Sequence, residues 1–66
     1  MAIAKTIEII AASTTSVEDA VKQGIAKAGE TVKQIEGFWV KDIKGVVRDN
    51  AVTEWRVILA LTFIVD

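Results

Sequence analysis

The side chains that most often carry catalysis and bind transition metals are missing from this sequence. The chain contains neither histidine nor cysteine, so a disulfide is excluded and a zinc site is not expected. General acid–base catalysis would need a carboxylate or a lysine that is strongly tuned by its surroundings. The hydroxyl run from Ser13 to Ser16 is typical of a helix cap and not of a nucleophile with its base. We therefore expect a protein that is not an enzyme.

Two side chains are suited to binding a small molecule. Trp39 could stack on a planar ring, and its alternative role is packing at a subunit interface, where tryptophan is common. The planar guanidinium of Arg56 suits a phosphate or a carboxylate. Its alternative role is an ion pair with Glu54, Asp42 or an acidic residue of a neighbouring copy. The sequence leaves both pairs of alternatives open.

The acidic residues form no recognisable metal motif. Glu8, Asp42, Asp49 and Glu54 could supply oxygen ligands to a hard cation at an interface. No stretch of the sequence has the ligand spacing of a dedicated cation-binding loop. We therefore predict no metal site and expect these carboxylates on the solvated surface.

The stretch from Thr53 to Val65 has the strongest structural pattern. Large apolar residues occupy every second position, which predicts a β-strand: Trp55, Val57, Leu59, Leu61, Phe63 and Val65. The positions between them include Ile58, Ala60 and Ile64, which are too apolar for a face left in water. A single helix can cover one face of the strand, and a partner must cover the other. The pattern therefore predicts a homo-oligomer.

Length and composition agree with assembly. A chain of 66 residues is a single domain, here residues 1–66, and buries too little surface to be more than marginally stable alone. The hydrophobic content is 52% and the net charge is −1, which gives no basis for nucleic-acid binding. The apolar run from Val57 to Val65 is much shorter than the roughly 20 residues of a membrane helix. With no signal-peptide pattern, a cytoplasmic location and no membrane partner are expected.

The remaining elements follow from periodicity. Ile3 to Ile10 alternates as a first strand, and a helix is predicted from about Ser16 to Ile35, where apolar residues follow helical spacing. Thr15 or Ser16 caps this helix. Gly24 lies on or beside the apolar stripe, where its expected role is to let the helix approach the sheet closely. Gly37 is predicted to end the helix.

Two further strands form a hairpin. Phe38 to Val47 and the stretch after Thr53 are joined by a tight turn at Asp49–Asn50. The helical connection places the first strand parallel to the second. The fold class is therefore α+β, with the order β-α-β-β, a sheet order first–third–second, and a sheet that wraps around one helix.

The hairpin also predicts which residues share a face. In a regular hairpin Gly37 lies opposite Thr62, Trp39 opposite Ala60 and Arg56 opposite Ile43. Gly37, Trp39 and Arg56 would then lie on the face turned away from the helix, which needs partners. A single bulge would break this pairing.

With these elements placed, the sequence resembles the dodecins. The resemblance rests on the order and spacing of short segments and not on one specific motif: Lys5–Ile10, Thr15–Ala20, Ala26–Ala28, Thr31–Val32, Val40–Gly45 and Arg56–Phe63. It implies a hollow shell of twelve subunits. It also implies a small-molecule-binding protein that holds flavins, such as FMN or riboflavin, in pairs at subunit interfaces.

The sequence departs from the dodecin pattern at two positions. In flavin-binding dodecins a tryptophan just after the helix stacks on the isoalloxazine ring, and a glutamine on the third strand bonds its polar edge. Gly37 occupies the tryptophan position and Arg56 the glutamine position. We therefore expect a shell that binds a flavin or a nucleotide-like ligand through Gly37, Trp39 and Arg56, with weakened flavin binding. The alternative is a structural or interaction assembly that no longer binds flavin.

Overall fold

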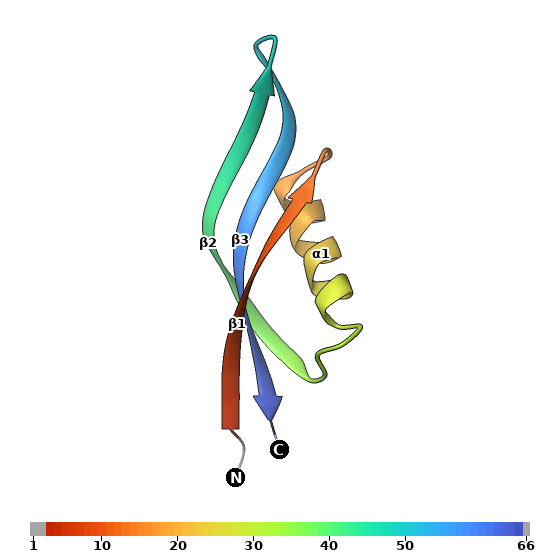
Figure 1. Cartoon of the computed structure of the whole chain (residues 1–66), viewed down its shortest axis with the longest axis vertical. Helices are drawn as coiled ribbons and strands as arrows, with labels where there is room; N and C mark the ends of the chain where they lie inside the picture. Colours follow the sequence, from red (N-terminus) through yellow and green to blue (C-terminus); the bar gives the residue numbers. More distant parts are fainter. Residues whose placement is uncertain (1–2, 66) are drawn as a thin grey trace.

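A computed structural model describes residues 3–65 and has the predicted element order (Figure 1). It consists of β1 (Ile3–Ser13), α1 (Val17–Ala28), β2 (Ile35–Arg48) and β3 (Ala51–Val65). The three strands form one antiparallel sheet in the order β1-β3-β2. The predicted β-α-β-β fold and sheet order are therefore confirmed, and the most apolar strand is the central one.

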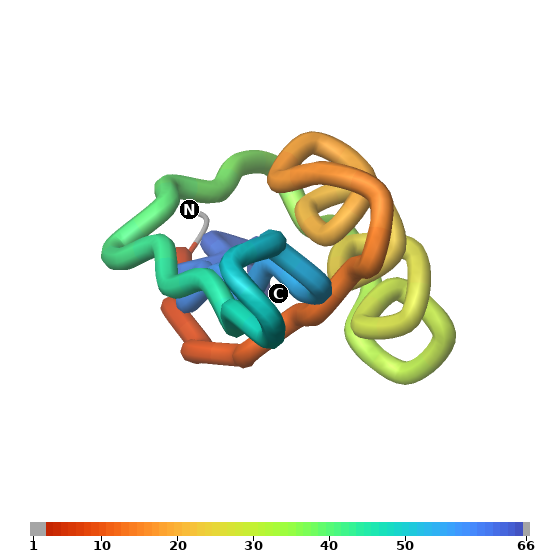
Figure 2. The backbone as a smooth tube through the Cα atoms, turned by 90° about the horizontal axis from the view of Figure 1, so that it is seen from above, coloured from red at the N-terminus to blue at the C-terminus, as the bar shows by residue number. Residues whose placement is uncertain are grey.

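The molecule is elongated, because the hairpin of β2 and β3 extends beyond the helix (Figure 1). Its extents are 52 × 19 × 13 Å. The single helix lies on one side of the sheet and packs mainly against β1 and β3 (Figure 2). Much of β2 therefore has no helix over it.

The core forms where α1 covers the central strand. Val57, Leu59 and Leu61 are fully buried, as their alternation predicts. Half-buried apolar side chains from the helix and both outer strands surround them: Ile7, Ile9, Val17, Val21, Ile25, Ala28 and Ile35. Trp55 is half-buried opposite Ser13, at the end of this core.

The helix begins and approaches the sheet as the sequence predicts. Of the two candidate caps, Ser16 is the one used, because its Oγ accepts a hydrogen bond from the Asp19 N–H at 3.0 Å. Gly24 is buried against β1 and β3. A β-carbon added there would lie 2.9 Å from the Ala11 Cβ and 3.3 Å from the Leu59 Cδ1. Close approach is therefore the role of Gly24.

The predicted helix end at Ile35, with Gly37 as the residue that ends the helix, is wrong. The helix ends at Ala28, and Gly37 lies within β2. Gly29 follows as the C-cap, and its N–H donates to the Ile25 carbonyl. The next residues include two β-branched ones, which are poorer helix formers. Ile35 fitted the helical stripe, but it contacts the core from the start of β2 instead.

All three strands are longer than predicted, and β3 begins at Ala51 and not at Thr53. β1 continues to Ser13 and not only to Ile10, since Ala11 and Ala12 pair with Val57 and Arg56. β2 begins at Ile35, ahead of Phe38. Ala11, one of the residues added to β1, lies where the helix approaches β1 closely, since a β-carbon added at Gly24 would lie 2.9 Å from its Cβ.

The predicted turn of the hairpin is confirmed, and its predicted register is confirmed in part. Asp49 and Asn50 both have positive φ, 51° and 63°, which is the two-residue type I′ turn that suits the twist of a hairpin. Gly37 pairs with Thr62 and Trp39 with Ala60, as predicted.

The predicted pairing of Ile43 with Arg56 is wrong. A register shift between Val40 and Asp42 places one extra residue, Lys41, in β2. Ile43 therefore pairs with Val57, and Lys44 pairs with Arg56. A bulge of this kind changes which side chains of a strand face each side of the sheet.

Gly24→Ala tests the close approach of the helix. We expect the variant to lose about 1–3 kcal/mol of stability through overpacking, although alanine is the better helix former by about 1 kcal/mol. Gly29→Ala is the matched control. Gly29 has an ordinary helical φ of −65°, and an added β-carbon would lie 3.2 Å from the Ile25 carbonyl oxygen but near no side chain of the sheet, so stability should change less than in Gly24→Ala. Urea denaturation at one fixed protein concentration measures both. A Gly24→Ala protein as stable as the parent would show that the helix is not held this close.

Candidate functional site

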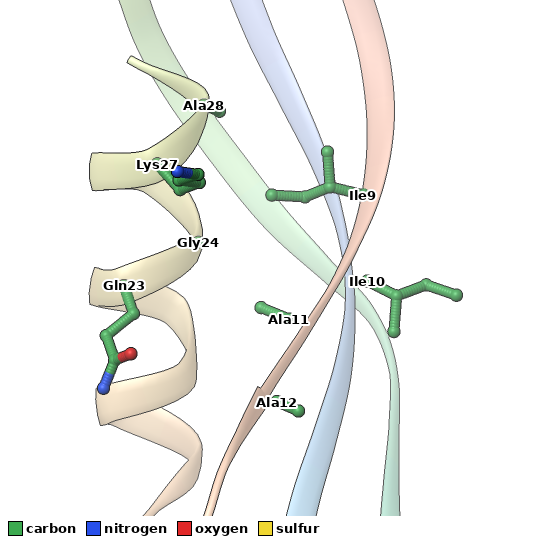
Figure 3. A pocket seen from close by; sticks show the side chains of 8 residues that line it. All are labelled: Ile9, Ile10, Ala11, Ala12, Gln23, Gly24, Lys27 and Ala28. Atoms are coloured by element: carbon green, nitrogen blue, oxygen red, sulfur yellow. The ribbon is translucent and has the colours of Figure 1, made fainter. Parts of the chain in front are cut away.

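The candidate ligand-binding surface is the face of the sheet turned away from α1, which we call the outer face. Side chains alternate along each strand, so Ile9 and Ala11 point toward the helix and Ile10 points away from it (Figure 3). Residues paired across strands share a face, and the register therefore assigns the outer face: Thr6, Glu8, Ile10 and Ala12 of β1, Arg56, Ile58, Ala60 and Thr62 of β3, and Gly37, Trp39, Asp42 and Lys44 of β2.

The three predicted binding residues all lie on the outer face, but they do not form one cluster within a single chain. Gly37 and Trp39 are two residues apart on β2, or about 7 Å along the strand. Arg56 lies four residues from Ala60, the partner of Trp39, which is about 14 Å along β3. A ligand that contacts Trp39 and Arg56 together must be long or must bridge two copies of the chain.

Trp39 presents a large accessible aromatic surface. The residue is 51% exposed, whereas the neighbouring Ala60 is only 1% exposed. Glu8 and Trp39 flank Ala60 on the outer face and therefore cover its methyl group. About half of the surface of Trp39 therefore remains available to a ligand or to a neighbouring subunit.

An ion pair that the sequence did not predict crosses the outer face. The Nζ of Lys41 lies 2.8 Å from the Oε2 of Glu8, which joins the two outer strands across β3. Both side chains are about half exposed, so the pair contributes at most about 1 kcal/mol. Lys41 has the same parity as Trp39, and Glu8 lies in the row of Trp39 and Ala60 on the outer face, but the two residues are far apart in the sequence.

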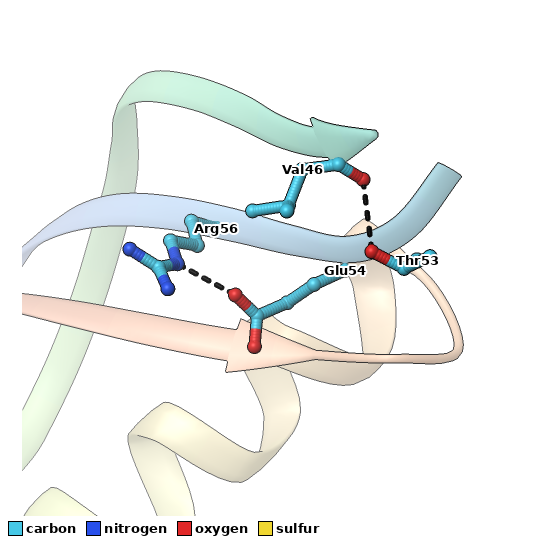
Figure 4. Close-up of polar contacts among 4 residues, drawn as sticks. All are labelled: Val46, Thr53, Glu54 and Arg56. Carbon is cyan, nitrogen blue, oxygen red and sulfur yellow. Dashed lines mark hydrogen bonds and ion pairs between the residues drawn. The ribbon is translucent and has the colours of Figure 1, made fainter. Parts of the chain in front are cut away.

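Arg56 is engaged by a carboxylate of its own strand. Its Nε donates to the Oε2 of Glu54 at 2.6 Å (Figure 4). This is one of the alternatives that the sequence left open. Lys44 lies directly opposite Arg56, and like charges in such positions repel. Glu54 offsets that repulsion.

The hydroxyl-rich link between β1 and α1 is structural, as expected. Ser13 Oγ donates to Asp19 Oδ2 at 2.6 Å and accepts from the Thr15 N–H at 2.9 Å. Gln23 Nε2 donates to the same carboxylate oxygen at 2.6 Å. These contacts fix the link ahead of the helix.

Within residues 3–65 no three acidic side chains converge as ligands for a metal ion.

Two hollows, neither of them predicted, lie beside the helix. An open groove of about 330 Å³ runs between α1 and β1 (Figure 3) and is lined mostly by apolar and small residues. Its lining includes Gly24 and Ala11, where the helix approaches β1 closely. A polar hollow of about 280 Å³ lies over the link and includes Thr14, Asp19 and Glu54.

The helix side of β2 carries exposed apolar residues whose exposure the sequence did not predict. Phe38 is 48% exposed, Val40 36% and Ile43 50%. The pairing of these residues with the core positions of β3 places them on the helix side, but α1 lies over β1 and β3.

No helix of the described chain has the length and hydropathy to cross a membrane.

Comparison with known proteins gives a consistent result. A family model described as Dodecin matches residues 3–66. A dodecin from Thermus thermophilus is 30% identical over 59 residues, which cover 89% of this chain and 86% of that protein. The crystal structure of a Thermus thermophilus protein superimposes with a TM-score of 0.94 at 27% identity, covering 100% of this chain and 97% of that one. The structure of dodecin from Streptomyces coelicolor gives 0.94 at 26% identity, covering 98% and 93%.

Proposed function

The chain belongs to the dodecin family, and we propose that it assembles into a shell of twelve copies that binds a planar small molecule at its subunit interfaces. Dodecins are small-molecule-binding proteins and not enzymes, so the proposed role is storage or sequestration without catalysis. We further propose that the shell binds flavins, such as riboflavin or FMN, more weakly than is usual in the family. Its proposed location is the cytoplasm.

Uncovered apolar surface supports assembly. Phe38 and Ile43 are about half exposed on the helix side of β2, and Ile10 is 72% exposed on the outer face. A chain this short cannot bury these residues on its own. Both sides of the sheet therefore offer surface that further copies can cover, which agrees with the sandwiched central strand inferred from the sequence.

The position of Trp39 carries the proposal of a bound ring. It is half exposed, and it shares the outer face with Gly37 and Arg56. A tryptophan on such a face can stack on a planar ligand, and a stacked pair contributes about 0.5–1.5 kcal/mol beyond the area it buries.

Two substitutions relative to the family pattern support weak flavin binding. Gly37 supplies no ring at the usual stacking position. Arg56 can donate hydrogen bonds but cannot accept them, whereas a flavin edge presents acceptors together with one N–H donor. In addition, Glu54 already occupies the Nε of Arg56.

The second candidate function is a structural or interaction shell without flavin. The Arg56–Glu54 contact favours it, because an internally paired arginine does not require a ligand. Under this alternative Trp39 packs against another subunit.

Riboflavin titration separates the two functions. We expect weak binding by the unmodified protein and at least about tenfold tighter binding by Gly37→Trp, because a restored ring contact of about 1.4 kcal/mol corresponds to one decade in Kd. Quenching of riboflavin fluorescence measures both. Nanomolar binding by the unmodified protein would show that Gly37 does not weaken the site. No binding by either protein would favour the structural shell.

Ile58→Lys tests assembly through the outer face. A lysine at this half-buried apolar position should reduce the particle mass or prevent folding, because the charge would have to be buried between subunits. Ile58→Val is the matched control and should keep the parent mass. Light scattering gives the mass, and circular dichroism reports folding. An unchanged Ile58→Lys particle would mean that subunits do not meet at this position.

A further inference from the structure

Two apolar surfaces that the chain leaves uncovered lie at opposite edges of its sheet. One is the groove of about 330 Å³ between α1 and β1. The other consists of Phe38, Val40 and Ile43 on the helix side of β2, which we call the β2 stripe. In the order β1-β3-β2 the two edge strands are β1 and β2. Because β3 lies between them, one chain cannot place its own stripe in its own groove.

The shape of the groove suits side chains of another protein segment. Sites for small molecules enclose most of the ligand surface, whereas this groove is open and runs along α1 and β1 (Figure 3). Residues 9–12 of β1 line it over about 10 Å. Phe38 and Val40 are two residues apart, or about 7 Å along β2, so both side chains fit within this length. Ile43 lies further along the strand, beyond the end of the groove.

The charges beside the two surfaces are opposite. Lys27 is the one charged residue of the described chain that lines the groove, and Glu36 precedes Phe38 by two residues. Both residues are exposed. Lys27 has only a loose contact in its own chain, with Glu30 at 3.6 Å, and none of the ion pairs within residues 3–65 engages Glu36. A second copy therefore offers each of the two charges a partner.

We propose that the β2 stripe of one copy packs into the α1–β1 groove of a second copy, with Glu36 beside Lys27 of the partner subunit. This inference rests on the proposed assembly, since it names the surfaces that meet. The two surfaces differ, so the contact is head-to-tail, and such contacts close into a ring where the rotation allows it. A closed shell needs a second kind of contact to join such rings, and the outer face around Ile58 supplies one.

Carbodiimide cross-linking of the unmodified sequence tests the contact. The reagent joins a lysine amine to a carboxylate as an amide and takes up the water released, so it adds no spacer and couples groups that are already paired. Ordinary and heavy-nitrogen-labelled protein are unfolded together in urea, refolded and cross-linked. We expect a peptide that joins Lys27 to Glu36 with one labelled and one unlabelled half.

The label separates contacts between copies from contacts within one chain. Native mass spectrometry first verifies that the refolded particles contain both labels. A Lys27–Glu36 peptide whose halves always carry the same label, or the absence of this peptide from mixed particles, would overturn the proposal. Lys27→Arg is the matched control, because it keeps the charge but has no amine to couple. It should lose the peptide and keep the particle mass.

Phe38→Asp tests the apolar part of the contact. Phe38 is 48% exposed in the single chain, so the variant should fold. The new carboxylate would lose water in the groove without gaining a partner, and we expect the particle to fall to a smaller assembly or to single chains. Phe38→Leu is the matched control and should keep the parent mass. Light scattering measures mass, and circular dichroism reports folding. A folded Phe38→Asp particle of parent mass would overturn the proposal.

The outcomes distinguish this inference from the proposed function. A parent protein that is a folded single chain overturns the assembly itself. An assembled parent that lacks the mixed-label peptide overturns only the pairing of stripe and groove, and leaves the groove to another partner. If Phe38→Asp does not fold, the cross-link in the unmodified sequence still decides.

Discussion

One helix of twelve residues has to cover the central strand of a three-stranded sheet. It does so by approaching closely at Gly24, where even a methyl group would lie 2.9 Å from Ala11. The core of Val57, Leu59 and Leu61 is complete as a result. The same short helix leaves β2 and the outer face without cover. The buried core of the single chain and the apolar surface that it leaves uncovered therefore have the same origin.

The sequence predicted the parts of the fold that depend on local chemistry. Strict alternation along β3 predicted the core positions, and Asp49–Asn50 predicted the turn that fixes the register near it. The end of the helix was not predictable in this way, because Ile35 satisfies both a helical stripe and the first position of a strand. Only its contact with the core from β2 decides between them.

The candidate site was predictable to a similar extent. Alternation and the register of the hairpin predicted that Gly37, Trp39 and Arg56 share a face. The structure has the predicted register around Trp39. The bulge at Lys41 did not follow, because apolar residues occur at both parities in β2. Without the bulge, the Lys44–Arg56 pairing could not be foreseen. The charge distribution on the outer face is therefore a property of the fold and not of any local motif.

Site and assembly are linked by this geometry. Trp39 and Arg56 are about 14 Å apart along the sheet of one chain, so a small ring can contact both only where two copies meet. Native mass spectrometry of the purified protein, titrated with riboflavin, tests that link most directly. The account predicts a particle of twelve copies that takes up riboflavin weakly, with no riboflavin on single chains. A folded single chain as the main species, or riboflavin carried by single chains, would contradict it.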